Sequence, residues 1–215
     1  MGVISADKMM VKARGPVWHK KQKQQGLVPK GLHGLDREAT WCFSKADSWV
    51  YGHGSFCLTT HEPPVLGAFK WMPNSAHEAK RLQAELPKFE RQVKIACMDS
   101  KADDYPLYRQ LKDHYDIQLL TTMRRGKDKT PERQQMRREL NTERHRRIYA
   151  QRSHLVEPMQ SLVKNIFELD QCWMRGNANN RWLFAAMGVA VQIAQFQAYQ
   201  YNLSTWCVKD AVLGV

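Results

Sequence analysis

The chain has 215 residues, with 33 Lys and Arg against 21 Asp and Glu, which gives a formal net charge of +12. A hydrophobic fraction of 43% is typical of a folded globular protein and excludes disordered and fibrous classes, and the length predicts a single domain over residues 1–215. The longest apolar run, Trp182 to Ala194, is too short to span a membrane, so it predicts a buried helix and no membrane partner. Without a secretion signal, we expect a cytoplasmic protein whose five scattered cysteines are reduced.

Two segments hold the whole excess of positive charge. Residues 1–30 carry seven basic and one acidic side chain, and residues 124–152 carry eleven basic and four acidic ones. Such blocks bind polyanions by releasing counterions, so they predict a nucleic acid as partner, with a solvated charged surface as the alternative. The second block has too few apolar residues for a packed helix, so we expect a basic surface insertion over about residues 124–148.

The periodicity of the apolar residues predicts the elements in chain order. We expect a strand over residues 3–6, a loop over 12–40, a hairpin over 49–60 and 65–72, a helix from residue 74 or 75 to 88, a strand over 93–98, a helix over 105–114, a strand over 117–122, the basic insertion, and C-terminal helices within about 155–203. Strands that alternate with helices in this way predict an α/β fold with a mixed sheet flanked by helices.

Two of the predicted strands end in aspartate, at Asp7 and Asp99, and Glu157 lies at the start of a late helix. If the first and fourth strands are neighbours, Asp7 and Asp99 face each other, because the carboxyl ends of parallel strands converge. Converging carboxylates are suited to Mg²⁺, and two such ions about 3.5 to 4 Å apart support phosphodiester chemistry. The alternative is that aspartate commonly follows strands and glutamate commonly occupies first helical turns.

Other motifs narrow the chemistry. The eight histidines form no HxxH or HExxH pattern, so we expect no zinc site. The sequence also has no glycine-rich phosphate-binding motif, so we expect no use of a nucleotide triphosphate. Four tryptophans are concentrated early in the chain, where packing is the first interpretation and stacking on unpaired bases is the alternative: Trp18, Trp41, Trp49 and Trp71.

Three stretches of the sequence carry a resemblance to a known family. The first, ISADKMMVKARGPVWHKKQKQQG, contains Asp7, and the second, CMDSKADDYPLYRQL, contains Asp99 and Asp103. The third, YAQRSHLVEPMQSLVKNIFELDQCWMRG, contains Glu157 and, seven residues beyond it, Lys164. In this order they resemble the three catalytic motifs of bacterial insertion-sequence transposases of the IS-four-like type, which have an Asp-Asp-Glu (DDE) catalytic domain, with Glu157 in the place of the catalytic glutamate.

The resemblance implies an RNase H-like fold in which Asp7, Asp99 and Glu157 bind Mg²⁺, with Mn²⁺ as a substitute. It implies cleavage at transposon ends followed by transfer of the freed 3′-hydroxyl to target DNA, in a nucleoid-associated protein that acts as a homodimer in the synaptic complex. The expected DNA contacts include the phosphate near the cleaved end and the backbone on either side, from the following residues: Tyr149, Arg152, Lys164, Lys20, Lys21, Arg146 and Arg147.

Two departures from the family pattern affect these expectations. Arg152 and Glu157 are five residues apart instead of four, which on a continuous helix puts the two side chains about 140° apart. We therefore expect the helix to begin between His154 and Glu157, because Pro158 is tolerated only near a helix start, with His154 in the arginine's place as the alternative. Family members also have an N-terminal helical region that recognises the transposon ends, whereas only six residues precede Asp7 here. A truncated or inactive remnant that only binds DNA is therefore an alternative, as is an RNase H-like nuclease.

Overall fold

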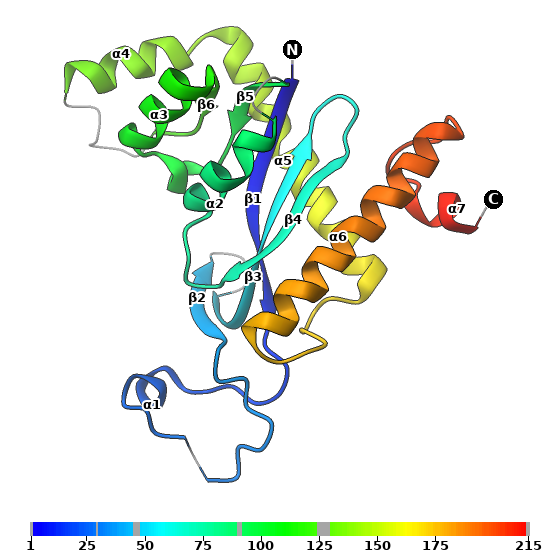
Figure 1. The fold of residues 1–215 in the computed structure, drawn as a ribbon. Coiled ribbons are helices and arrows are strands. Elements are labelled where there is room, and N and C mark those ends of the chain that lie inside the picture. Colours follow the sequence, from blue (N-terminus) through cyan, green and yellow to red (C-terminus); the bar gives the residue numbers. More distant parts are fainter. Residues whose placement is uncertain (1, 29, 45–47, 90–91, 124–129, 214–215) are drawn as a thin grey trace.

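The computed structural model describes residues 2–28, 30–44, 48–89, 92–123 and 130–213, and its centre is a mixed sheet with helices on both faces (Figure 1). This confirms the predicted α/β class. The elements are β1 Gly2–Lys12, α1 Lys20–Gln24, β2 Thr40–Ser44, β3 Ser48–Thr60, β4 Leu66–Pro73, α2 Glu78–Glu85, η1 Leu86–Phe89, β5 Val93–Cys97, η2 Ser100–Ala102, α3 Tyr105–Tyr115, β6 Gln118–Leu120, α4 Pro131–Leu140, α5 Glu143–Phe167, α6 Asn177–Gln200 and α7 Val208–Leu213.

Strand β1 lies between the antiparallel and the parallel parts of the sheet. It pairs antiparallel with β3 on one side and parallel with β5 on the other, and β6 extends the parallel part beyond β5. The strand order is β2-β3-β1-β5-β6, and β4 also pairs with β3. The predicted hairpin is present as β3 and β4, which pair antiparallel. The first and fourth predicted strands, β1 and β5, are therefore neighbours.

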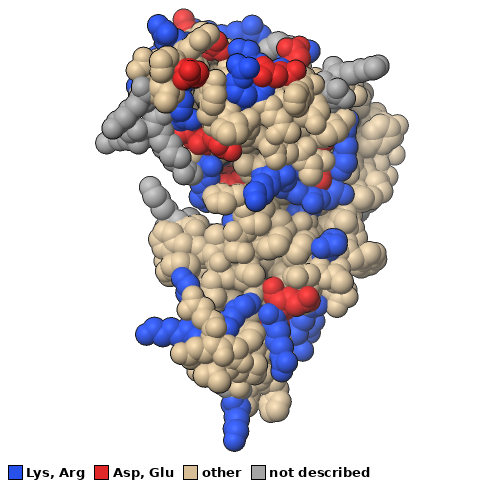
Figure 2. All heavy atoms as spheres, turned by 60° about the vertical axis from the view of Figure 1, so that its left-hand side comes forward, with Lys and Arg blue, Asp and Glu red and all other residues tan. Residues whose placement is uncertain are grey.

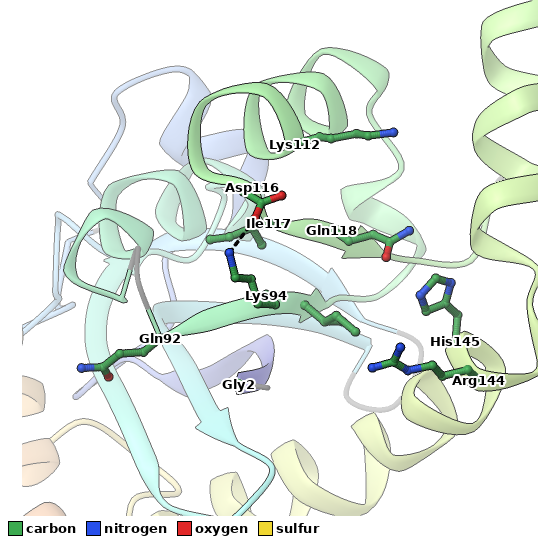
Figure 3. A pocket seen from close by; sticks show the side chains of 10 residues that line it. Gly2, Gln92, Lys94, Lys112, Asp116, Ile117, Gln118, Arg144 and His145 are labelled. Carbon is green, nitrogen blue, oxygen red and sulfur yellow. Dashed lines mark hydrogen bonds and ion pairs between the residues drawn. The ribbon is translucent and has the colours of Figure 1, made fainter.

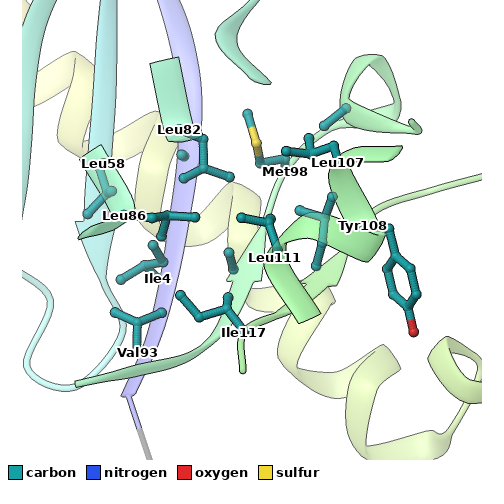
Figure 4. Close-up of a cluster of buried hydrophobic side chains, with 14 of the residues drawn as sticks. Ile4, Leu58, Leu82, Leu86, Val93, Met98, Leu107, Tyr108, Leu111 and Ile117 are labelled. Carbon is teal, nitrogen blue, oxygen red and sulfur yellow. The ribbon is translucent and has the colours of Figure 1, made fainter. Parts of the chain in front are cut away.

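The residues of β1 alternate between two hydrophobic clusters, one on each face of the sheet. Ile4 and Ala6 pack with Leu82 and Leu111 in a cluster that joins the sheet to α2 and α3 (Figure 4). Met9 and Val11 belong to a second cluster, which includes side chains of α5 and α6. The helices thus cover the sheet because both faces of its central strand are apolar.

The N-terminal part of the chain is more regular than predicted. Strand β1 does not end at Ala6, because its ladder with β3 continues to the pair Lys12 and Gly52. The segment expected as a loop over residues 12–40 contains the short helix α1, and β2 adds a strand that was not predicted. Asp7 therefore lies within a strand, two residues beyond the end of its pairing with β5 at Ser5.

The described part of the predicted basic insertion contains a packed helix, which its shortage of apolar residues argued against, and the insertion itself stays a prediction. Its first residues, 124–129, lie outside the described residues, but residues 131–140 form helix α4. Met136 is 1% exposed and packs into the cluster beneath α2 and α3, and Arg133 is 8% exposed and forms an ion pair with buried Asp103. Together with Leu140, which is partly buried against the same cluster, these residues hold a largely exposed helix on the domain.

Helix α5 also corrects the prediction, because it runs unbroken from Glu143 to Phe167 with Pro158 inside it. The expected start between His154 and Glu157 is wrong. Proline removes one backbone donor from a helix interior, a loss that tertiary packing can offset. Here the buried residues Val156, Met159 and Val163 hold the helix against the sheet on both sides of the proline.

Helix α6 begins at Asn177, five residues before the predicted start, and its apolar run is buried on one face only. Phe184 and Val191 are buried, whereas Trp182, Ile193 and Phe196 are more than half exposed. Within the described ranges, none of the helices combines the length and the apolar character that crossing a membrane requires.

Candidate metal centre

The register of the parallel strands brings Asp7 and Asp99 to the same level of the sheet. Ser5 of β1 pairs with Cys97 of β5, and each aspartate follows two residues later. This geometry is the one that the sequence predicts for neighbouring strands. One oxygen of each carboxylate accepts a main-chain hydrogen bond of 2.8 Å, from Lys8 N to Asp7 and from Lys101 N to Asp99. These bonds fix the orientation of both carboxylates.

A third carboxylate joins them, and it belongs to Glu78. One carboxylate oxygen each of Asp7, Glu78 and Asp99 lies within 4.8 Å of the other two. Glu78 is 1% exposed, and neither of its carboxylate oxygens has a hydrogen-bond partner in the described part of the chain. A buried carboxylate without a partner is costly, and a bound cation would remove that cost. The three oxygen donors match the ligand preference of Mg²⁺ or Mn²⁺.

The loop before α2 places Glu78 at this position. The ammonium group of Lys8, next to Asp7 in the chain, donates to the carbonyl of Asn74 at 2.8 Å and to that of Ala76 at 3.2 Å. The Asn74 side chain is buried and donates to the carbonyl of Val50 at 3.0 Å. The helix was predicted to begin at residue 74 or 75, but it begins at Glu78, and Asn74 fastens the preceding loop to the sheet instead.

The electrostatics of the site are those of crowded acids. Burial raises the pKa of Asp7 to about 6 from an ordinary value of 3.8, and the charges of Asp99 and Glu78 act in the same direction. The Lys8 N–H and the charge of Arg152 oppose this rise. Without a cation, Asp7 is thus partly in its neutral, protonated form at a pH near 6. A divalent ion would reverse this, since it favours the ionised form.

Two residues of the third motif lie beside the acids. The Arg152 guanidinium is 3.5 Å from a carboxylate oxygen of Asp7, and it lies over the ring of Tyr149 at 5.8 Å. Tyr149 accepts a hydrogen bond of 3.0 Å from Thr122, one residue after Thr121, which donates to the Asp99 carbonyl. The structure therefore brings Tyr149 and Arg152 to the carboxyl ends of β5 and β6, where the parallel pairing of β1 ends.

Glu157, by contrast, is not among the described residues that gather around Asp7 and Asp99. It is exposed on α5, where it lines a shallow hollow with His154 and Pro158. Because α5 is continuous, the five-residue spacing leaves Glu157 about 140° around the helix from Arg152, which faces Asp7. A catalytic role for Glu157 stays a prediction.

The expected DNA-contacting residues are spread over the molecule. Lys164 is twelve residues from Arg152 on α5, or about 18 Å along the helix axis. Arg146 and Arg147 are exposed in the first turns of α5, where Arg147 pairs with Glu143. Lys20 and Lys21 are exposed on α1. None of these cations lies in the acidic cluster, so only contacts with an extended polyanion could connect them to it.

Glu78 was missed in the sequence, although a signal for it exists. It precedes Leu82 by four residues and Leu86 by eight, and both leucines are fully buried. Residues spaced by four lie on one helix face, so Glu78 continues the buried side of α2. An acid at such a position indicates a buried carboxylate, and Arg81, three residues further on, pairs with Glu85 instead of Glu78.

A pocket of about 640 Å³ lies away from this cluster, at the opposite end of the parallel strands (Figure 3). It is lined by Gly2, Lys94 and Gln118, among others, and Lys94 forms an ion pair with Asp116 across it. It has no share in the acidic cluster, whose carboxylates lie beyond the other end of the parallel pairing of β1 and β5.

The chain is similar to known proteins over part of its length. Residues 112–196 match a family model described as a transposase DDE domain, a range that includes Tyr149 and Arg152 and ends before α7. The chain is also similar to a piggyBac transposase in a cryo-EM structure of its synaptic complex with hairpin DNA, at 11% sequence identity and a TM-score of 0.48. That similarity covers 88% of this chain and 45% of the other, so the chain spans less than half of that transposase chain. No curated protein matches the sequence. Over residues 112–196, the chain is thus similar to a transposase DDE domain.

Proposed function

We propose that the protein is a metal-dependent DNA strand-cleaving and strand-transferring enzyme of the DDE transposase type, with an RNase H-like catalytic domain. The observation that carries the proposal is the buried, unpartnered carboxylate of Glu78 beside Asp7 and Asp99. The mixed sheet and the family match over residues 112–196 support it.

In this proposal Asp7, Glu78 and Asp99 hold Mg²⁺, or Mn²⁺ in its place. The bound cations would activate a water or a 3′-hydroxyl and stabilise the leaving oxygen of a phosphodiester. The main-chain N–H groups of Lys8 and Lys101 keep two of the carboxylates in orientation before the metal arrives. Arg152 is 15% exposed at the edge of the cluster, where its charge can attract a DNA phosphate toward the acids.

The surrounding charge favours DNA as the substrate. Lys and Arg outnumber Asp and Glu by 33 to 21, and basic side chains occupy both ends of the face shown in Figure 2. A polyanion that extends beyond the acidic cluster would contact these side chains on either side. Binding of this kind weakens as salt is raised, because it depends on counterion release.

The test is Mg²⁺-dependent cleavage of a labelled DNA duplex by the parent and by Asp99→Asn. We expect the variant to lose at least about 100-fold in cleavage rate, since ligands matter at least as much as the groups that orient them. Its salt-sensitive binding to the same duplex stays within about twofold. Asp104→Asn is the matched control, because Asp104 is exposed in the same segment and lies outside the cluster. Equal cleavage by the parent and Asp99→Asn would sink the proposal.

An RNase H-like nuclease is the second candidate, favoured by the observation that Glu78, and not Glu157, completes the cluster. The two functions share the hydrolytic step and differ in the joining step. Incubation of a precleaved 3′-hydroxyl end with a supercoiled target plasmid separates them. Joined products support the transposase, whereas cleavage without joining supports the nuclease.

A further inference from the structure

The hairpin of β2 and β3 carries two aromatic pairs across its strands. Trp41 lies opposite Tyr51, and Phe43 lies opposite Trp49, with ring centroids 5.4 Å and 5.5 Å apart. Opposite residues in a sheet share a face, and side chains two positions apart along a strand point the same way. The four rings therefore form one row on one face of the hairpin.

The inner end of this row is covered, and the outer end is bare. Tyr51 is 3% exposed and packs with Trp18 and Ala39 in a small buried cluster. Phe43 is 51% exposed and Trp49 is 54% exposed. Trp18 is thus a packing residue, as its first interpretation predicts, whereas Phe43 and Trp49 form an exposed aromatic platform.

Lysines of α1 lie beside the aromatic platform. The ammonium of Lys20 is 4.2 Å from the ring centroid of Trp49, and Lys21 is exposed on the same helix, which carries three lysines and no acid. Lys23 donates to the carbonyl of Ala39 and so fastens α1 to the strand that leads into the platform. The lower end of the molecule, where α1 lies, presents several cationic side chains (Figure 2).

We propose that the aromatic platform and the lysines of α1 bind unpaired bases of a DNA strand. Exposed aromatic rings offer stacking surfaces to bases, and neighbouring lysines neutralise the phosphates between them. Duplex DNA keeps its bases stacked inside and can use only the lysines. The combination of Phe43, Trp49 and Lys20 therefore favours a strand with splayed bases over a duplex. The proposal rests on the proposed function for the identity of the polyanion.

The register of the sheet relates this platform to the acids. Asp7 is opposite Cys57 on β3, and Trp49 lies on the same face, eight residues away along that strand. The separation is about 26 Å at ~3.3 Å per residue. Where the DNA between the two sites stays stacked as in a duplex, this corresponds to about eight nucleotides at ~3.4 Å per nucleotide, and an extended strand covers the distance with fewer. The platform would thus hold unpaired DNA at most about eight nucleotides from the cleaved phosphate.

The test measures binding of the full chain to a labelled oligothymidylate and to a duplex of equal length, at one salt concentration without divalent metal. We expect Trp49→Ala and Phe43→Ala each to weaken binding to the oligothymidylate about tenfold, and to change duplex binding less than about twofold. Trp49→Phe should retain most of the affinity, because it keeps an aromatic ring. Trp182→Ala is the matched control, since Trp182 is 68% exposed on α6 and lies outside the platform.

Three outcomes would overturn the proposal. The first is unchanged binding to oligothymidylate by both platform variants, and the second is an equal loss of oligothymidylate and duplex binding. The third is full competition by polyglutamate for the platform, which would indicate an acidic protein partner. Asp99→Asn should bind oligothymidylate like the parent, so a failure of the cleavage assay and a failure of the platform are distinguishable. Unchanged thermal unfolding shows that each variant folds.

Discussion

Glu78 places a carboxylate oxygen within 4.8 Å of a carboxylate oxygen of Asp7, although the two residues come from different elements and Glu78 has no hydrogen bond to offset its burial. Two like charges in a low-dielectric site repel each other, and solvent can relieve little of this for a group that is 1% exposed. The arrangement stores unfavourable energy in the metal-free protein. A bound divalent cation would remove this repulsion, and the relief would contribute to the affinity of the site for the cation.

The first prediction concerns the third ligand. We expect Glu78→Gln to lower the affinity for Mn²⁺ at least about tenfold, because it removes one of three anionic oxygen ligands. Glu157→Gln should leave the affinity unchanged, since Glu157 is exposed and outside the cluster. Calorimetric titration of the two variants and the parent with Mn²⁺ measures both. The reverse pattern, with loss only in Glu157→Gln, would restore Glu157 as the third acid.

The second prediction concerns pH. Burial raises the pKa of Asp7 to about 6, so the folded protein binds this proton more tightly than the unfolded chain does. The stabilising contribution is complete below about pH 4 and is lost as the pH rises through about 6. Metal-free Asp7→Asn should therefore be more stable than the parent above this range, by on the order of 1–3 kcal/mol, and similar to it near pH 4.

Urea unfolding across this pH range, with a chelator present, measures the difference. Saturating Mg²⁺ should stabilise the parent and leave Asp7→Asn nearly unchanged, because the ion binds only the folded protein with intact ligands. A difference between the two proteins that stays constant with pH would contradict the assigned cause.

The two aspartates could be found in the sequence because the end of a short apolar run is visible in the local sequence. Asp7 and Asp99 follow short apolar runs, and a parallel pairing of those runs is enough to bring them together. Glu78 is different, because its burial depends on how α2 packs and on the loop that Lys8 fastens. Neither feature is visible in a pattern of apolar residues, although the spacing from Glu78 to Leu82 gives a hint of the buried face.

The errors in the fold have a common physical cause, which is tertiary packing that overrides a local rule. Pro158 suggested a helix start, but packing of Val156 and Met159 carries α5 through it. The basic block has too few apolar residues to predict a packed helix, but Met136 and the Arg133–Asp103 pair hold α4 on the domain. In each case a few buried residues outweigh many exposed ones.

The third prediction tests the buried ion pair. Arg133→Ala should destabilise the protein by about 3–5 kcal/mol, because it breaks a buried ion pair with the Asp103 carboxylate, which is 3% exposed. Arg138→Ala on the same helix should change stability by less than about 0.5 kcal/mol, since Arg138 is exposed. Equilibrium unfolding in urea measures both. Equal effects would mean that Arg133 acts only as another surface cation.

The fourth prediction tests the contact between α6 and β4. A Cβ atom added at Gly188 would lie 2.9 Å from the Cβ of Phe69 and 3.3 Å from its carbonyl oxygen, and Phe69 is buried on β4. Backbone atoms cannot move aside as a flexible side chain can, so Gly188→Ala should force the helix off the sheet and cost about 1–3 kcal/mol. This loss exceeds the gain that alanine normally brings to a helix, which is about 1 kcal/mol. Ala190→Ser, at an exposed position of the same helix, is the control and should change stability by less than about 0.5 kcal/mol. Thermal unfolding distinguishes the two variants, and a stabilised Gly188→Ala would show that α6 does not pack this closely on Phe69.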